Sequence, residues 1–377
     1  MPRRRSLLVR LAPLLLVAAL ALLAGRLLKR HLRAAAPPPP PPPEAEAAVD
    51  LPPRGPAATP GAHPILPPFR GDLDHPLLLD PGPAEPSGVV YLPEHEGFLV
   101  VDDESTLEPQ RGIFFLATTP DGGLSPIPVR LDDLGARQTW DDLEAVAASP
   151  ETLLFLASHA YDSSWRQRIC WAPRAGLSRA KEGEALLLEG LQCTSERRSR
   201  EALLEALEPA VGEEPELDLE GLTFSEAAGA FLVGVRHPLA KERALLLTLQ
   251  PPRGRSGHLQ IQLARTLDLK QRGIRGMSFL DRRRLVLAAG PAGDNPGRFD
   301  LYLHDLAEAD EAKATTLLTP AGFPLHLGGD PTARKLRIEG LAFDGEALLV
   351  LCDSGDWPEE GVSAAPTYTF RLPLQAD

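Results

Sequence analysis

The sequence has few aromatic residues and few cysteines, and it lacks the short motifs that mark common enzyme classes. Aromatic residues make up 5% of the 377 positions, and there are 3 cysteines. No G-x-S-x-G elbow, H-E-x-x-H pair, paired C-x-x-C or P-loop occurs. These absences exclude a motif-based assignment to serine hydrolases, zinc proteases, zinc ribbons or P-loop nucleotidases.

The cysteines leave two interpretations open. Either Cys170 and Cys193 pair across neighbouring strands, or all three thiols are unpaired, and we favour the second as the simpler. Cys352 stands in the middle of an apolar run, so we expect it to be a buried apolar residue.

Basic charge is scarce outside the first 35 residues. The formal net charge is -13, but residues 1–35 hold seven Arg and one Lys with no acid, which leaves about -21 for the rest. Such a surface repels phosphate backbones, and nucleic-acid binding is therefore excluded. Cations, or partners with basic patches, are the expected ligands.

The N-terminus has the pattern of a targeting segment. Arg3 to Arg5 precede an apolar run of 15 residues, Leu11 to Gly25. This run is shorter than the roughly 20 residues that span a bilayer, and no clear A-x-A site follows it directly. Residues 1–35 are therefore predicted to be a signal anchor, formed by a hydrophobic transmembrane helix, or a cleaved signal peptide. Both place the protein in the cell envelope, membrane-anchored or periplasmic.

A proline-rich linker follows at residues 36–75. Seven consecutive prolines, Pro37 to Pro43, favour an extended spacer of ~3.1 Å per residue. Such a spacer would hold a globular domain away from the membrane.

Residues 76–377 contain one hairpin phrase five times. Its small residue falls at five positions separated by 57, 76, 55 and 64 residues: Gly88, Ala145, Gly221, Gly276 and Gly340. Each interval holds about four short strands, which is the pattern of an all-β propeller. We predict five four-stranded blades, or six if another lies within residues 170–215.

Two further predictions concern the strand that completes the last repeat and a helix inserted in the second interval. The last repeat runs out at Thr367–Leu372 after three strands, so a strand around Pro76–Leu79 is expected to complete it. The second interval is long, and its residues 195–214 have the apolar spacing of an inserted helix.

The repeat also predicts which side chains gather at one mouth of the channel. In a four-stranded blade the first strand lines the channel and the second runs antiparallel to it, so first-strand starts and second-strand ends share a face. The starts carry Ser87, Glu144, Glu220, Arg275 and Glu339. The ends carry Asp102, Asp103, Glu104, His159, Arg236, His237, Asp294, Asn295, Asp353 and Asp356.

Three interpretations of this mouth compete. In the first, its glutamates pair with its arginines and hold the blades in register. In the second, carboxylates bind a hard cation such as Ca²⁺, with Glu144, Glu220, Glu339 and Asp103 as the metal ligands. In the third, the mouth is a catalytic or ligand-binding pocket formed by Arg236, His237, Arg275, His159, Asp353 and Asp356.

The same stretches resemble a bacterial family of unknown function. "DLEGLTF" from Asp218, "GIRGMSF" with "AGPAGD" from Gly273, and "RIEGLAFDGEALLVLCDSGD" from Arg337 resemble the domain of unknown function thirty-six-sixteen. This propeller-like family is distantly similar to esterase-like phytases, and the resemblance covers roughly residues 85–372. It implies calcium held at Glu144, Glu220 and Glu339. The chain departs from it at Arg275 and Ser87, where acids are expected.

Two functions follow from these expectations. The leading one is an envelope propeller that serves as a ligand- or partner-binding scaffold for an envelope protein or a small anionic ligand, with a polar, calcium-binding mouth. The alternative is a phytase-like, calcium-dependent phosphoester or ester hydrolase, in which Arg236, Arg275 and His237 hold the anionic substrate.

Overall fold

The computed structural model describes most of the residues beyond position 76. These are residues 77–79, 85–103, 112–120, 122–131, 142–160, 166–179, 185–212, 215–250, 259–293, 297–308, 311–319, 336–353 and 367–373. All of them belong to one compact unit, Asp50–Asp377. The predicted anchor at 1–35 and linker at 36–75 lie outside the described residues, and these domain boundaries stay predictions. Among the described residues, no helix has the length and apolar character needed to cross a membrane.

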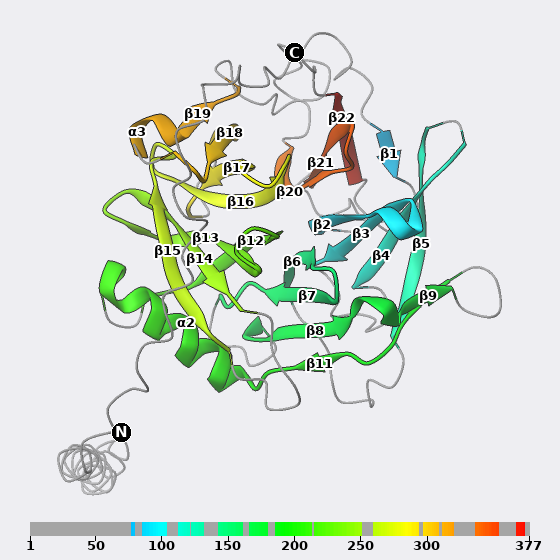
Figure 1. The fold of residues 1–377 in the computed structure, drawn as a ribbon, viewed down its shortest axis with the longest axis horizontal. Coiled ribbons are helices and arrows are strands. Elements are labelled where there is room, and N and C mark those ends of the chain that lie inside the picture. Colours follow the sequence, from blue (N-terminus) through cyan, green and yellow to red (C-terminus); the bar gives the residue numbers. More distant parts are fainter. Residues whose placement is uncertain are drawn as a thin grey trace, which may run out of the picture. The chain divides into compact units, whose positions relative to one another are not determined.

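The chain forms a five-bladed β-propeller, whose sheets surround a central axis (Figure 1). Blade 1 contains β2 (Pro86–Leu92), β3 (Gly97–Asp102), β4 (Ile113–Thr118) and β5 (Leu124–Leu131). Blade 2 contains β6 (Leu143–Ala148), β7 (Thr152–Ala157), β8 (Ile169–Pro173) and β11 (Gln192–Cys193). Blade 3 contains β12 (Asp218–Ser225), β13 (Ala230–Ala240), β14 (Arg243–Leu249) and β15 (Ile261–Leu267).

The last two blades follow the same order. Blade 4 contains β16 (Arg272–Phe279), β17 (Arg284–Pro291), β18 (Asp300–Asp305) and β19 (Thr315–Leu317). Blade 5 contains β20 (Arg337–Phe343), β21 (Ala347–Asp353), β22 (Thr367–Pro373) and β1 (Leu77–Leu79). The strand β1 pairs antiparallel with β22, with Leu78 opposite Tyr368. This pairing confirms that a strand from the N-terminal side completes the last blade.

The core lies between the blades. The inner strands are apolar on both faces because each sheet is packed against two neighbours: in β3, Leu99 and Val101 pack toward blade 2, and Phe98 and Val100 toward blade 5. A buried strand of this kind reads in the sequence as a short continuous apolar run. Neighbouring first strands approach closely at the axis, since a Cβ atom on Gly88 would lie 2.6 Å from the Cα atom of Ala145.

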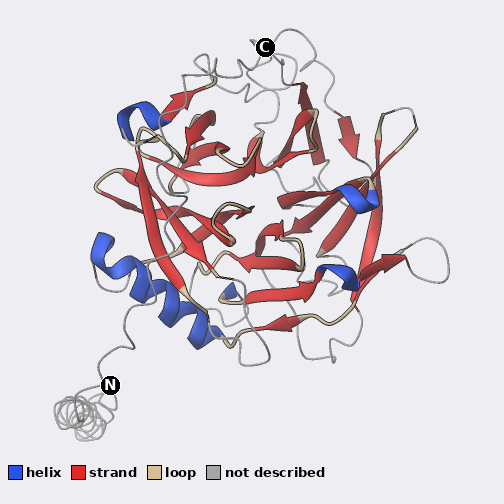
Figure 2. Cartoon of the chain, viewed as in Figure 1, coloured by secondary structure: helices blue, strands red, loops and turns tan. Residues whose placement is uncertain are grey.

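Residues 170–215 do not form a sixth blade, so that alternative is wrong. The strand β10 (Leu186–Leu188) pairs in parallel with β5, and β9 (Leu177–Arg179) pairs with β10, which extends blade 1 to six strands. The expected helix is α2 (Glu196–Val211), which lies beside β15 on the outside of the propeller (Figure 2). Its Leu203 and Leu207 are fully buried in the core between blades 2 and 3.

The cysteines differ from our expectation. Cys170 in β8 and Cys193 in β11 stand directly opposite each other and form a disulfide, so the interpretation with three unpaired thiols is wrong. Cys352 is free and buried, as expected.

Candidate functional site

Every first strand carries a β-bulge at the same place. The register with the second strand shifts around one extra residue in each blade, and these five residues, here called the bulge ring, are Ser87, Glu144, Glu220, Arg275 and Glu339. A bulge leaves its extra residue out of the ladder and re-aims the side chain. All five residues are at most 9% exposed. The five start positions predicted from the sequence are therefore the bulged residues.

One part of the mouth is closed by ion pairs. The Nη1 atom of Arg275 donates to Oε1 of Glu220 at 2.9 Å and to Oε2 of Glu339 at 3.2 Å. The Nη1 atom of Arg236 donates to the same Oε1 of Glu220 at 2.8 Å and lies 2.9 Å from Oδ2 of Asp218. The ion-pair interpretation is thus confirmed for Glu220 and Glu339. Their predicted role as metal ligands is not favoured by these contacts.

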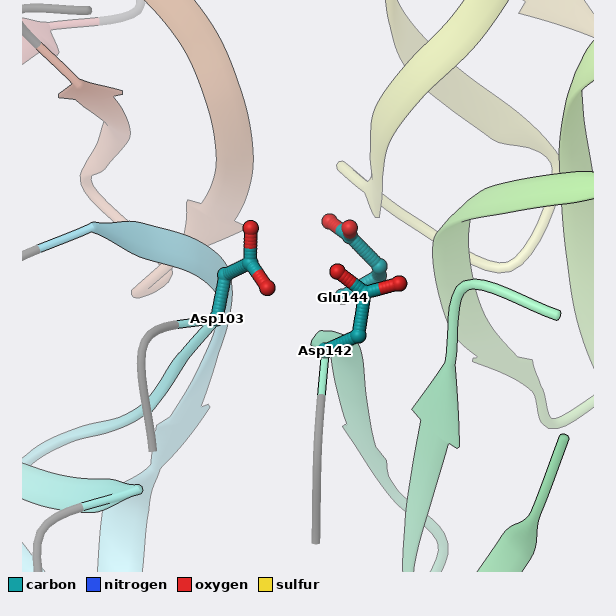
Figure 3. Close-up of side chains that lie close together, drawn as sticks. All are labelled: Asp103, Asp142 and Glu144. Carbon is teal, nitrogen blue, oxygen red and sulfur yellow. The ribbon is translucent and has the colours of Figure 1, made fainter. Parts of the chain in front are cut away.

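The other part of the mouth gathers carboxylates. Asp103 follows β3 of blade 1, whereas Asp142 and Glu144 belong to the start of β6 in blade 2. One oxygen from each of the three lies within 4.8 Å of the others (Figure 3). In the part of the chain that the structure describes, a positive charge comes from Arg166, whose Nη1 atom lies 3.3 Å from Oδ2 of Asp142. The hydroxyl of Ser158 also donates to Asp142.

Burial and crowding disfavour the ionised forms of Asp103 and Glu144. Burial, and then the neighbouring Asp142, raise the pKa of Asp103 to about 10. Burial raises the pKa of Glu144 well above its usual range, with Asp103 and Glu220 as further causes. Closely spaced carboxylates cannot all ionise unless a positive charge lies among them. Arg166 offsets one negative charge of the cluster, and protons or a further cation would offset the rest.

The donor set fits a hard cation. Two oxygens on opposite sides of a calcium ion, each bound at ~2.4 Å, lie ~4.8 Å apart, and the three carboxylate oxygens lie no farther apart than this, so one ion can reach all three. All three donors are carboxylate oxygens, which suit calcium, magnesium or manganese better than zinc or copper. The residues that would hold such a cation are Asp103, Asp142 and Glu144, whereas the resemblance implied Glu144, Glu220 and Glu339.

A buried oxygen points to a further polar ligand near the axis. The Oε2 atom of Glu220 is buried and has no hydrogen-bond partner among the described residues. Glu220 and Glu339 also line a small central cavity together with Gly88, Gly276 and Gly340. Its volume of about 10 Å³ is close to the smallest that holds one water molecule.

The predicted histidines are less suited to a ligand pocket. His159 is fully buried, its Nδ1 atom lies 2.7 Å from the carbonyl oxygen of Ala157, and burial lowers its pKa to about 4. A contact between its ring and an external ligand would need an exposed imidazole, so that prediction is not supported. His237 is half-buried at the end of the first-to-second-strand pairing in blade 3, opposite Asp218.

Of the remaining predicted ligand-binding residues, the structure describes Asp353 but not Asp356. Asp353 is buried at the end of β21 and helps to raise the pKa of Glu339 to about 8, although burial is the main cause. Asp356 lies outside the described residues, as do Glu104, Asp294 and Asn295.

Sequence reasoning missed Asp142. It stands two residues before a bulge-ring acid, and the same D-x-E spacing recurs at Asp218 and Glu220. Its backbone is left-handed, with φ of 64°, next to His159 with φ of 61° across the strand pair. Such conformations in residues other than glycine are strained and cluster at functional sites. The repeated D-x-E is the signal that would have identified it.

Comparisons with known proteins bear on the fold alone. No protein-family model and no curated protein matches the chain, and the resemblance to the family of unknown function and to phytases stays a prediction. Among solved structures, an exo-β-1,3-galactanase from Phanerochaete chrysosporium is 11% identical, with a TM-score of 0.44 over 77% of this chain and 61% of its own. An exo-β-1,3-galactanase from Clostridium thermocellum is 12% identical, with a TM-score of 0.43 over 77% and 59%. This chain thus spans about 60% of the length of these enzymes.

Proposed function

We propose that this protein is an envelope-associated propeller that binds a divalent cation, calcium, at its channel mouth and acts as a ligand- or partner-binding scaffold. The three-carboxylate cluster carries the proposal. Asp103, Asp142 and Glu144 meet from two different blades, within the reach of one calcium ion. An ion there would fasten blade 1 to blade 2 and remove the cost of crowding buried acids.

The scaffold is favoured over the phytase-like hydrolase by the arginines. In the hydrolase, Arg236 and Arg275 would hold an anionic substrate, but both donate to Glu220 from Nη1. Arg275 is also 7% exposed, which leaves little of it for a ligand. We therefore assign recognition of an envelope partner to the loaded mouth and its surrounding surface.

The disulfide supports the predicted location. Structural disulfides persist in oxidising compartments such as the bacterial periplasm and are rare in the cytosol. The bond between Cys170 and Cys193 thus agrees with a domain exported by, or tethered through, residues 1–35. The linker at residues 36–75 would then set its distance from the membrane.

Thermal unfolding of the full chain tests the cation site. Calcium at 100 times its dissociation constant stabilises a folded protein by ~2.7 kcal/mol. We expect the melting temperature to rise by several degrees in calcium relative to excess chelator. The double variant Asp103→Asn and Asp142→Asn should lose that rise.

The matched control is Glu226→Gln, which alters a carboxylate in an exposed pair with Arg282 and should keep the wild-type response. An absent shift in the wild type, or an equal shift in the double variant, would refute the cation site. Hydrolysis of p-nitrophenyl phosphate in calcium, abolished in the double variant, would restore the hydrolase in place of the scaffold.

A further inference from the structure

One member of the bulge ring differs from the acids on either side of it. Arg275 of blade 4 stands between the ring glutamates of blades 3 and 5, Glu220 and Glu339. Its Nη1 atom contacts carboxylate oxygens of both, at 2.9 and 3.2 Å. The guanidinium also lies 5.6 Å from the centre of the Phe299 ring, which favours a cation on its face.

This arrangement places a permanent positive charge where two blades present carboxylates to each other. Arginine does not lose its proton in proteins, so the charge is independent of pH and of ion concentration. On the opposite part of the ring, Glu144 is the acid and the corresponding blade 1 position is Ser87, which donates to the carbonyl oxygen of Glu85. There, among the described residues, the three carboxylates of Asp103, Asp142 and Glu144 stand beside the guanidinium of Arg166.

We propose that Arg275 is a tethered cation that fills one of two cation positions at the mouth. It thereby confines the exchangeable ion to the side of Asp103, Asp142 and Glu144, and it sets the stoichiometry at one. Arg275 is in this sense the residue that determines how many ions the mouth accepts, and where.

The surroundings of Glu220 and Glu339 support a second position. Oε2 of Glu220 is buried without a hydrogen-bond partner among the described residues, so one carboxylate oxygen remains available even with the arginines in place. The central cavity is lined by both glutamates. Removal of the Arg275 guanidinium would leave Glu339 without this ion pair, while Arg236 would remain on Oε1 of Glu220. The free Oε2 of Glu220 and the carboxylate of Glu339 would then face the space that the guanidinium had filled, and carboxylate oxygens are the ligands of hard cations.

Isothermal titration of the full chain with calcium chloride tests this inference. The one ion expected in the wild type rests on the proposed function, whereas the expected effect of replacing Arg275 does not. The wild type and Arg275→Lys, which keeps the charge, should bind one ion, and Arg275→Met should bind two. The exposed Arg282, in the turn at the other end of blade 4, gives the matched control: Arg282→Met should bind one.

The outcomes separate the two proposals. One ion in the wild type and one in Arg275→Met would overturn the role of Arg275 and leave the proposed function standing. No ion in the wild type and one in Arg275→Met would support the role of Arg275 and refute the wild-type cation site. No ion in either protein would overturn both.

A second variant covers the case in which Arg275→Met does not fold. Ser87→Arg places a guanidinium at the blade 1 position of the ring, next to Glu144 and Glu339. By the same logic it should bind no calcium and should no longer gain thermal stability from it. Calcium binding by a folded Ser87→Arg protein at the wild-type stoichiometry would overturn the inference. Folding of Arg275→Met in calcium but not in chelator would support it.

Discussion

The guanidinium of Arg275 donates to Glu220 at 2.9 Å, although the two residues are 55 positions apart and belong to different blades. Both side chains are almost fully buried, so this contact joins blades 3 and 4 at the axis. Breaking a buried ion pair from one side typically costs ~3–5 kcal/mol, because the remaining charge is left uncompensated.

Loss of the Glu220 carboxylate should therefore be costly. Glu220→Ala removes the acceptor shared by Arg236 and Arg275, and we expect the free energy of unfolding to fall by ~3–5 kcal/mol in urea titrations. Glu226→Ala, from an exposed pair, should cost less than ~1 kcal/mol. Equal effects of the two variants would contradict the account of the mouth.

The pairing of the N-terminal strand β1 with β22 should stabilise the propeller as well as complete its last blade. Deletion of residues 77–79 leaves β22 without its outer partner, and we expect the melting temperature to fall by several degrees. Amide hydrogen exchange at Thr367 and Thr369 should become faster. Deletion of three linker residues, Pro40 to Pro42, is the control and should change neither quantity.

The disulfide between Cys170 and Cys193 should form in protein produced under oxidising conditions and should stabilise it. The two cysteines are 23 positions apart, and closing a loop of that size is worth ~3 kcal/mol in the chain-entropy estimate. Replacing both by alanine should lower the free energy of unfolding by that amount. Without reductant, unfolded wild type should react with a maleimide at Cys352 alone, and labelling of all three cysteines would contradict the bond.

His304 should make stability depend on pH. It is 1% exposed, and burial, with nearby Arg265 as a further cause, lowers its pKa to about 4, compared with ~6.5 in an unfolded chain. Between pH 6.5 and 4 the unfolded state binds a proton at this histidine that the folded state does not, so the contribution of His304 to stability falls as the pH falls. The largest decrease in the free energy of unfolding that this histidine can cause is ~3 kcal/mol.

Urea titrations at several pH values test the histidine. His304→Gln should reduce the dependence between pH 4 and 6.5 and leave the part due to His159, whose pKa burial also lowers to about 4. His95→Gln, in the short helix Pro93–His95, should leave the dependence unchanged. An unaltered slope in His304→Gln would show that other groups cause the acid sensitivity.

Much of the fold was predictable because the repeat is local. Each first strand carries a small residue near its middle, and strands packed on both faces appear as short apolar runs. The five hairpins and the closing strand therefore followed from the sequence. The β9–β10 hairpin did not, because nothing in residues 177–188 says that it pairs with β5 of the preceding blade. The sequence raised the disulfide only as the less favoured alternative for the same reason: the spacing of Cys170 and Cys193 does not reveal that their strands are partners.

The sequence predicted which residues lie at the channel mouth, but not which of them form ion pairs with one another. The repeat identified the five positions of the bulge ring. A bulge takes its extra residue out of the ladder, which explains how a polar residue can directly follow a buried apolar one such as Leu219. Which acids pair with arginines, and which gather in the acidic cluster, depends on which blades are neighbours and on how long the side chains are. Arg275 reaches two glutamates, while Asp142, outside the positions considered, completes the acidic cluster.

The most direct test of the cation site is a crystal structure of the full chain grown in calcium, with anomalous data collected at long wavelength. We predict one calcium peak at ~2.3–2.6 Å from oxygens of Asp103, Asp142 and Glu144. No peak there, with Arg166 folded over the three carboxylates instead, would contradict the account.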